Sequence, residues 1–258
     1  MAPIITLTTD FGTADGYVGE LKGVLLTRAP LAMLVDITHE IAPQDAESAR
    51  LSVARYWRRF PAGTVHLVVV DPEVGTARAA LAVHSDGCWL VGPDNGVLSP
   101  ALLVNGARTV ALRVPENAAP TFHGRDVFAP AAAALAMGAS LETLGTAFPH
   151  PVVKRTPEPR RRSDGVVEGI VIAVDRFGNL ITNLIAPRGG PVEIAGHALE
   201  VRVRYSDVPP GALAALVGSS GLVEIAARDG HAARVLGAVR GAPVVFYPER
   251  GGATARPS

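Results

Sequence analysis

Short, continuous runs of Ile, Leu and Val alternate with helical segments over roughly the first 148 residues, and this alternation constrains the fold more than any other feature. The apolar runs predict strands at residues 4–8, 32–36, 64–70, 79–84, 88–91 and 108–113. Because the runs are continuous, they favour a sheet covered on both faces. Segments with helical periodicity begin at Tyr17, Asp45 and Phe128, and Asp45 is a candidate N-cap. The pattern predicts an open α/β sheet with flanking helices.

The character of the sequence changes after residue 152. The segment VKRTPEPRRRSDG, from residue 153, has prolines and arginines but no apolar period, which is typical of a solvated linker. Beyond it, short strands separated by Gly and Pro, with one modest helix at DGHAARVLGA, predict a small β-barrel or β-sandwich. We therefore expect an α/β domain at 1–152, a linker at 153–166, a β domain at 167–250 and a frayed tail at 251–258.

Composition excludes several classes of function. Hydrophobic residues make up 48% of the chain and charged residues 19%, enough apolar material for a real core. Basic and acidic residues both number 24, so no net charge recruits nucleic acid. Cys88 is the single cysteine, which excludes an intrachain disulfide. No leader or membrane span is visible, so we expect a cytoplasmic protein with no membrane partner.

Polar residues interrupt the apolar elements in four clusters. Carboxylates at a strand edge, as in the first cluster, suit a ribose diol or an ammonium group, and an Asn side chain, as in the fourth, suits a purine edge. In the second cluster we expect an acid and an arginine to face each other across a tight loop at the mouth of the sheet. The clusters are TLTTDFGTADGYVG with Asp10 and Asp15, VVVDPEVGTAR with Asp71 and Arg78, PTFHGRDVFAP with His123, and AVDRFGNLITN with Asp175 and Asn179.

Each cluster also has a structural interpretation. The first could be turn and capping chemistry, the second a strand end with a solvated acid, and the fourth a β-bulge with an Asx turn. In the third, a histidine before a helix is more often structural than catalytic, and Asp126 could cap that helix. The other histidines have weaker contexts and are interpreted as structural: His39, His66, His84, His150, His197 and His231.

In their order and spacing the motifs are more specific than any one of them alone. The series TLTTDFGTADGYVGELKGV, DITHEIAPQD, VVVDPEVGTAR, VGPDNGVL, TFHGRDVFAP, DRFGNLITN and GSSGLVEIA resembles the S-adenosylmethionine hydroxide adenosyltransferase family, relatives of the S-adenosylmethionine-dependent chlorinase and fluorinase. The resemblance extends from about Ile4 to Pro248. It implies an N-terminal Rossmann-like open sheet, a smaller C-terminal β-barrel, and a homotrimer with substrate between one subunit's N-terminal domain and its neighbour's C-terminal domain.

The resemblance also implies an activity and a set of site residues. The reaction is hydrolysis of S-adenosylmethionine to adenosine and methionine, with a catalytic triad of Asp71, Arg78 and His123 and neither a cofactor nor a metal. The implied substrate contacts are Asp10 on the ribose hydroxyls; Asp15, Tyr17 and Asp175 around the ammonium end of methionine; Ser219 and Ser220 on its carboxylate; Phe177 and Asn179 framing adenine with Tyr205 stacked on it; and Phe122 beside the reacting carbon.

The implied chemistry accounts for these residue types. The sulfonium leaves as a neutral thioether, so the reaction needs an oriented, deprotonated water rather than a general acid. Asp71 or His123 could take the proton, and the sequence leaves both assignments open. An acid at position 71 repels halide, and the halogenating relatives carry an uncharged residue there, so Asp71 favours hydroxide transfer.

The sequence departs from the family pattern at two positions, and three rival functions are considered beside the implied one. Glu73 stands where the family often has glycine, which would be strained at positive φ, and it could place a second acid near the site. Arg228 stands where a small or amide residue is common, at the position where the resemblance implies main-chain recognition of adenine. The rivals are a non-catalytic S-adenosylmethionine or adenosine sensor, a halogenase, and a metal-dependent hydrolase built on Asp10, Asp71, Asp94, His123 and Asp126.

Overall fold

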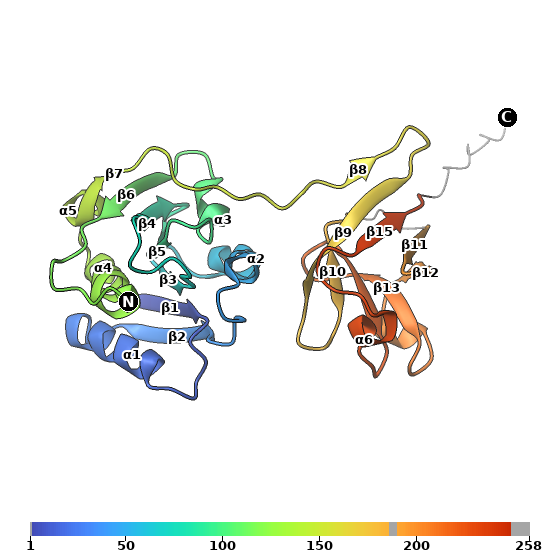
Figure 1. Cartoon of the computed structure of the whole chain (residues 1–258), viewed down its shortest axis with the longest axis horizontal. Coiled ribbons are helices and arrows are strands. Elements are labelled where there is room, and N and C mark those ends of the chain that lie inside the picture. Colours follow the sequence, from blue (N-terminus) through green and yellow to red (C-terminus); the bar gives the residue numbers. More distant parts are fainter. Residues whose placement is uncertain (1, 186–189, 249–258) are drawn as a thin grey trace. The chain divides into compact units, whose positions relative to one another are not determined.

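The chain forms two compact units in the computed structural model, which describes residues 2–185 and 190–248 (Figure 1). The units are Met1–Arg155 and Thr156–Ser258. The division between them falls within the Pro- and Arg-rich segment 153–166. The tail expected at 251–258 lies outside the described residues. Within the described part of the chain, no helix has the length and apolarity needed to cross a bilayer.

The first unit is built on a seven-stranded sheet, which confirms the predicted open α/β architecture. Strands β2, β1, β3 and β5 run parallel, whereas β4, β6 and β7 continue the sheet with antiparallel pairings. The order across the sheet is β2-β1-β3-β5-β4-β6-β7. The strands are β1 Ile4–Thr9, β2 Met33–Thr38, β3 Val65–Val69, β4 Ala80–Ser85, β5 Cys88–Pro93, β6 Arg108–Leu112 and β7 Gly145–Ala147.

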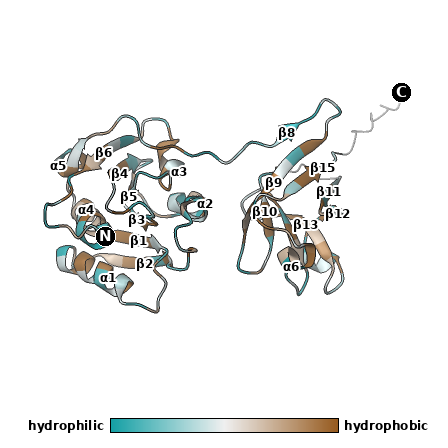
Figure 2. Ribbon diagram, viewed as in Figure 1, coloured by the Kyte–Doolittle hydropathy of each residue, from teal (hydrophilic) through white to brown (hydrophobic). Residues whose placement is uncertain are grey.

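Both faces of this sheet are covered, as the continuous apolar runs predict. Leu67 and Val69 of β3 point into one buried cluster with α1 and α4, while Val68 and the following Val70 belong to a second cluster with α2 and α3. Successive residues of a strand point to opposite faces, so a strand buried on both sides is mostly apolar, and His66 is the exception in β3. In Figure 2 hydrophobic colour lies mainly on strands, whereas many loops are hydrophilic. The helices are α1 Tyr17–Arg28, α2 Ala46–Tyr56, α3 Ser99–Leu102, α4 Ala129–Ala136 and α5 Leu141–Leu144.

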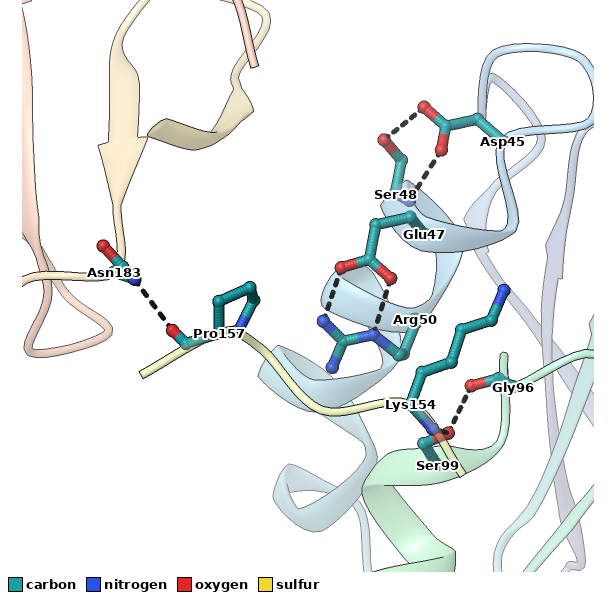
Figure 3. Close-up of polar contacts among 9 residues, drawn as sticks. All are labelled: Asp45, Glu47, Ser48, Arg50, Gly96, Ser99, Lys154, Pro157 and Asn183. Carbon is teal, nitrogen blue, oxygen red and sulfur yellow. Dashed lines mark hydrogen bonds and ion pairs between the residues drawn. The ribbon is translucent and has the colours of Figure 1, made fainter. Parts of the chain in front are cut away.

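The starts of two helices test the predicted caps. Asp45 caps α2 as expected, because its carboxylate accepts a hydrogen bond from Ser48 N at 3.0 Å (Figure 3). The cap predicted at Asp126 is wrong. A π-helical turn, Gly124–Phe128, runs directly into α4, so Asp126 lies inside helical structure. Its carboxylate instead accepts from Ala119 N at 2.9 Å and pairs with Arg125.

The second unit is a β-barrel rather than a sandwich. Within the described residues, seven strands follow one another in the order β10-β14-β13-β12-β11-β15-β9, and a further pairing of β10 with β9 closes the ring. Six neighbouring pairs are antiparallel and one, β12 with β13, is parallel. The elements are β8 Arg160–Arg161, β9 Val167–Val174, β10 Leu180–Thr182, β11 Pro191–Ile194, β12 His197–Arg202, β13 Leu213–Val217, β14 Val223–Ala227, α6 Ala232–Leu236 and β15 Pro243–Phe246.

Candidate active site

Three acids follow the carboxyl ends of three neighbouring parallel strands in the first unit. Asp10 comes directly after β1, Asp71 follows β3 and Val70, and Asp94 follows β5. Thr9 and Val69 are paired in register, so the chain leaves β1 and β3 at the same level. In open α/β sheets this edge is where ligands bind, and here it carries a row of carboxylates.

Asp71, Arg78 and His123 are in contact at this edge. Arg78 Nε donates to Asp71 Oδ1 at 3.0 Å, Arg78 Nη2 pairs with Asp71 Oδ2, and Nη2 also lies 3.0 Å from His123 Nδ1. The side chains of Arg78 and Asp71 are only 5% and 6% exposed, and His123 is also buried. The Arg78 guanidinium lies over the Phe128 ring, 5.3 Å from its centroid. The sequence motifs, 45 residues apart for Arg78 and His123, therefore form one connected group.

The turn between Asp71 and Arg78 is pressed against the segment that carries His123. Val74 N donates to Asp71 O at 3.3 Å and Thr76 N donates to Glu73 O at 3.1 Å, which folds the turn tightly. Gly75 has a φ of +79°, and a Cβ there would lie 2.6 Å from the carbonyl oxygen of Pro120. Only glycine satisfies both the left-handed conformation and this close approach. Gly75 therefore lets the turn pack beside Pro120, three residues before His123.

The contact with Arg78 fixes the protonation of His123. A guanidinium only donates, so Nδ1 of His123 accepts, and the neutral ring carries its proton on Nε2. Burial lowers the pKa of His123, and the positive charge of Arg78 lowers it further, against the opposing effect of Asp71. A neutral imidazole that presents an N–H donor from Nε2 is the form that this environment favours.

The predicted ribose and methionine contacts of the first unit lie next to this group. Asp10 Oδ2 accepts from Gln44 N at 2.8 Å, and within the described residues its Oδ1 has no hydrogen-bond partner and remains able to accept one. Tyr17 and Phe122 pack edge to face, with ring centroids 5.4 Å apart, and Phe11 completes an aromatic trio with them. Tyr17 is 49% exposed, and Asp15 is exposed in the loop before it. The trio gives the acidic edge an apolar wall.

The second unit holds the predicted adenine contacts on a turn built by Asp175. Asp175 Oδ1 accepts from Phe177 N and Asn179 N, both at 2.9 Å, and Oδ2 accepts from Asn179 Nδ2 at 3.0 Å. This is the Asx-type turn of the structural interpretation, and a register shift follows at Ile181 and Thr182 of β10. The bond from Nδ2 to Asp175 uses one of the two amide hydrogens of the buried Asn179 and leaves its carbonyl oxygen unused by Asp175, whereas Phe177 is 75% exposed.

Glu224, an acid that the sequence did not point to, contacts Tyr205 and lies against Gly218, the residue before Ser219 and Ser220. Tyr205 OH donates to Glu224 Oε1, and a Cβ at Gly218 would lie 2.5 Å from Glu224 Oε2. The bond to Glu224, with partial burial and the negative charges of Glu224 and Asp175, raises the pKa of Tyr205 to about 12. Glu224 therefore links Tyr205 to the exposed turn that carries Ser219 and Ser220. A short glutamate-containing strand after GSSG was the available sequence signal.

The loop after β5 bonds to the backbone beside Asp71 and Arg78 and also receives the start of the linker, whose bond from Lys154 to Ser99 is drawn in Figure 3. Asp94 N donates to Ala79 O at 3.0 Å, beside Arg78, and Asn95 Nδ2 donates to Val70 O at 2.9 Å, just before Asp71. Asp94 Oδ1 accepts from Val152 N at 2.7 Å, and Ser99 Oγ accepts from Lys154 N at 2.8 Å. The asparagine and aspartate of PDNG thus fix the strand ends next to Asp71 and Arg78.

The departures and the metal hypothesis can be judged from the same geometry. Glu73 is exposed and is absent from the residues with positive φ, so the strain considered for it does not arise. Arg228 Nη1 donates to Val208 O at 2.8 Å and so holds a loop of the second unit.

Among the described residues, no three His, Cys, Asp or Glu side chains are grouped so that they could hold a metal ion. The five residues considered for such a site are instead engaged separately with Arg78, Arg125 and backbone amides.

Comparison with known proteins assigns the chain to a family. Residues 5–145 match the SAM hydroxide adenosyltransferase N-terminal domain, and residues 169–245 match the SAM hydroxide adenosyltransferase C-terminal domain. The chain belongs to the SAM hydroxide adenosyltransferase family. The resemblance found in the motifs is therefore confirmed over both units.

Members of this family and solved structures resemble the chain over most of its length. A Thermus thermophilus protein named (R)-S-adenosyl-L-methionine hydrolase is 43% identical over 258 residues, covering 95% of this chain and 99% of the relative. A crystal structure of a conserved Thermotoga maritima protein has a TM-score of 0.86 at 34% identity, covering 94% of this chain and 99% of its own. A more distant relative, named fluorinase, from an Actinoplanes species is 30% identical, covering 70% of this chain and 72% of the relative.

Proposed function

We propose that this protein hydrolyses (R)-S-adenosyl-L-methionine to adenosine and L-methionine. The observation that carries the proposal is the buried contact of Asp71, Arg78 and His123 at the carboxyl edge of the sheet, in a chain 43% identical to a relative named for this activity. Asp10, with its free carboxylate oxygen, and the aromatic trio stand beside the triad, where a nucleoside would be bound.

The chemistry requires a water molecule aligned with the bond that breaks. Water attacks C5′ of the ribose, the C5′–sulfur bond breaks, and its electron pair goes to sulfur, which leaves as the neutral thioether of methionine. The oxygen that becomes bonded to C5′ then loses one proton. A leaving group that is already stable needs no acid, so the protein contributes orientation and a proton acceptor.

The hydrogen bonds favour Asp71 as the proton acceptor, a choice that the sequence left open. Nδ1 of His123 already accepts from Arg78 and Nε2 carries a proton, so the neutral ring has no free lone pair. Each oxygen of Asp71 keeps a second acceptor site beside its bond to Arg78. Once it is bonded to C5′, the water oxygen carries a positive charge and is a far stronger acid than free water. A carboxylate therefore suffices as the base. In this arrangement His123 donates to the water and Arg78 holds both partners in place.

Incubation of the purified protein with S-adenosylmethionine tests the proposal against each rival. Release of adenosine and methionine in equal amounts supports hydrolysis. Binding of S-adenosylmethionine or adenosine without any turnover would identify a sensor. Formation of 5′-chloro-5′-deoxyadenosine at high chloride would identify a halogenase, and loss of turnover after chelator treatment would identify a metal-dependent hydrolase. An acid beside the nucleophile, as Asp71 is here, disfavours attack by an anion.

Assembly and location follow from the resemblance and remain proposals. A homotrimer would allow one subunit's first unit to share a substrate with a neighbour's second unit, which carries the predicted adenine contacts. Size-exclusion chromatography with light scattering tests the trimer. We also propose a cytoplasmic location, which cell fractionation tests.

A further inference from the structure

Two threonines of strand β1 each make a buried hydrogen bond to a histidine. Thr6 Oγ1 lies 2.8 Å from His66 Nδ1, and Thr9 Oγ1 lies 2.8 Å from His39 Nδ1. Both threonines are 0% exposed, and both histidines are buried. The two pairs are chemically alike but differ in place: Thr6 is in the middle of the strand, whereas Thr9 is its last residue and directly precedes Asp10.

His39 holds the chain on both sides of Asp10. Its imidazole bonds to Thr9, the residue before Asp10, and its carbonyl oxygen accepts from Gly12 N at 2.8 Å, two residues after Asp10. Thr9 Oγ1 also accepts from Phe11 N at 3.3 Å. The segment from Thr9 to Gly12 is therefore tied to one residue at both ends, and Asp10 lies between the ties.

His39 is itself held by charged groups of two other elements. His39 Nε2 lies 3.1 Å from Asp36 Oδ1 of β2, an electrostatic contact outside ordinary hydrogen-bond angles. Lys22 Nζ of α1 donates to Asp36 Oδ2 at 2.6 Å. Partial burial works against ionisation of Asp36, but the contacts with Lys22 and His39 prevail and lower its pKa. Asp36 therefore contacts Nε2 of the imidazole, whereas Thr9 contacts Nδ1 of the same ring.

The loop that begins at His39 also reaches the Asp10 side chain directly. Gln44 N donates to Asp10 Oδ2 at 2.8 Å, and Gln44 adopts a left-handed backbone with a φ of +68°. A non-glycine residue in this conformation is unusual and is kept where surrounding contacts require it. This bond orients one oxygen of Asp10, while the ties at Thr9 and Gly12 set the position of its backbone.

We propose that His39 is a positioning residue that sets the orientation of the Asp10 carboxylate toward the ribose hydroxyls of the substrate. The inference rests on the proposed function, because it assumes that Asp10 receives a ribose. It gives His39, a residue interpreted from the sequence as structural, a role in substrate affinity. His66, which makes the same kind of bond away from this edge, has no such role.

Matched substitutions in β1 separate positioning from simple structural support. Thr9→Val and Thr6→Val each remove one buried hydroxyl from an isosteric, β-branched side chain and leave a histidine without its partner. Adenosine affinity is measured by titration calorimetry, kcat and KM by adenosine release, and folding by urea denaturation. We expect Thr9→Val to weaken adenosine binding and to raise KM about tenfold, with kcat changed less than about threefold. We expect Thr6→Val to leave adenosine affinity, KM and kcat within about twofold of the parent.

Two further, conservative variants control for misfolding of the valine variants. Thr9→Ser keeps the hydroxyl and should restore adenosine affinity to within about threefold of the parent. Asp36→Asn alters a side chain that is 44% exposed and should weaken adenosine binding about threefold without unfolding the protein. Asp36→Asn changes neither Asp10 nor the bond between Thr9 and Phe11 N, so its loss of affinity is transmitted through the contact of Asp36 with His39.

The outcomes distinguish failure of this inference from failure of the proposed function. If the parent binds and releases adenosine but Thr9→Val has the same affinity as Thr6→Val, or Asp36→Asn matches the parent, the positioning role is overturned alone. If the parent neither binds adenosine nor forms it from S-adenosylmethionine, the proposed function fails and this inference falls with it.

Discussion

Arg78 holds both carboxylate oxygens of Asp71, and each of the two side chains is almost completely buried. A two-point bond between a guanidinium and a carboxylate fixes direction as well as distance. Since a buried charge without a partner is strongly destabilising, neither residue can be removed without a structural effect on the other. The most informative substitutions at this site are therefore conservative ones that keep shape while changing charge or reach.

The first prediction concerns the charge of Asp71. Asp71→Asn keeps the shape and one acceptor oxygen but removes the base, so kcat should fall at least ~100-fold while adenosine binding changes little. Asp86→Asn is the matched control, since Asp86 pairs with Arg58 on an exposed part of the same unit and should leave turnover unchanged. Steady-state kinetics and calorimetry measure both effects. Undiminished turnover in Asp71→Asn would exclude this residue as the base.

The second prediction concerns the reach of Arg78. In Arg78→Lys a single ammonium cannot hold both oxygens of Asp71 and Nδ1 of His123 at once. We expect kcat to fall about 100-fold, the usual effect of a misplaced reacting group, with KM altered less than about threefold. The control, Arg58→Lys, changes an exposed ion pair and should have parental kinetics. Equal kinetics in the two variants would contradict the orienting role of the guanidinium.

The third prediction concerns the dependence of stability on pH. Burial lowers the pKa of His66 from 6.5 to about 4, against the opposing effect of a bond to the Trp57 backbone. Because the unfolded chain binds this proton at a higher pH than the folded one, stability falls as the pH drops from about 6.5 towards 4, by about 3 kcal/mol from this group. Urea unfolding at pH 7 and pH 4.5 measures the loss.

His66→Asn supplies the comparison for the pH experiment, since it removes the titrating group and keeps an acceptor for Thr6. Its stability should change less with acid than that of the parent. Trp57 and Trp89, the only two tryptophans of the sequence, both lie in the first unit, so their fluorescence follows the unit that contains His66. The same acid sensitivity in parent and variant would assign the loss to other groups.

The fourth prediction concerns the turn that presents Asn179. Gly178 has a φ of +85°, and a Cβ there would lie 2.2 Å from Nδ1 of His231, whose ring caps α6. Gly211 has a φ of +80° with open space around it, so Gly211→Ala carries the conformational penalty without the clash. Gly178→Ala should weaken adenosine binding at least about tenfold beyond Gly211→Ala, since the turn must move to admit a methyl group. Calorimetry with adenosine compares them, and equal affinities would place adenine elsewhere.

The fold was largely predictable because its strands are unusually apolar. The strand expected at 4–8 is β1 at Ile4–Thr9 and the one at 64–70 is β3 at Val65–Val69, since burial on both faces leaves a strong signal. The short strand β7, Gly145–Ala147, has no such signal, because it exists only through pairing with β6. The π-helical turn at Gly124–Phe128 was missed for a related reason: its geometry depends on the contacts of Asp126 with Arg125 and Ala119.

The candidate site was predicted in its residues but not in its connections. The acid, guanidinium and imidazole were visible as motifs, and their contact agrees with the triad that the resemblance implies, whose role the variants above test. The bonds from Gln44 to Asp10 and from Asn95 to the end of β3 join segments far apart in sequence, and such pairings depend on three-dimensional packing. Polar residues just beyond other strand ends, such as His39, were the available hint.

Within the described residues the closed ring of the second unit has seven strands, and an odd number alone forbids strict alternation of direction around it. Somewhere two neighbours must run the same way, and here they are β12 and β13. Parallel neighbours cannot be joined by a tight hairpin, so the chain needs the longer excursion through residues 203–212, which carries Tyr205 on a short 3₁₀ turn. A ring with an even number of strands could alternate strictly in direction and would not need that excursion, which here supplies Tyr205 and its bond to Glu224.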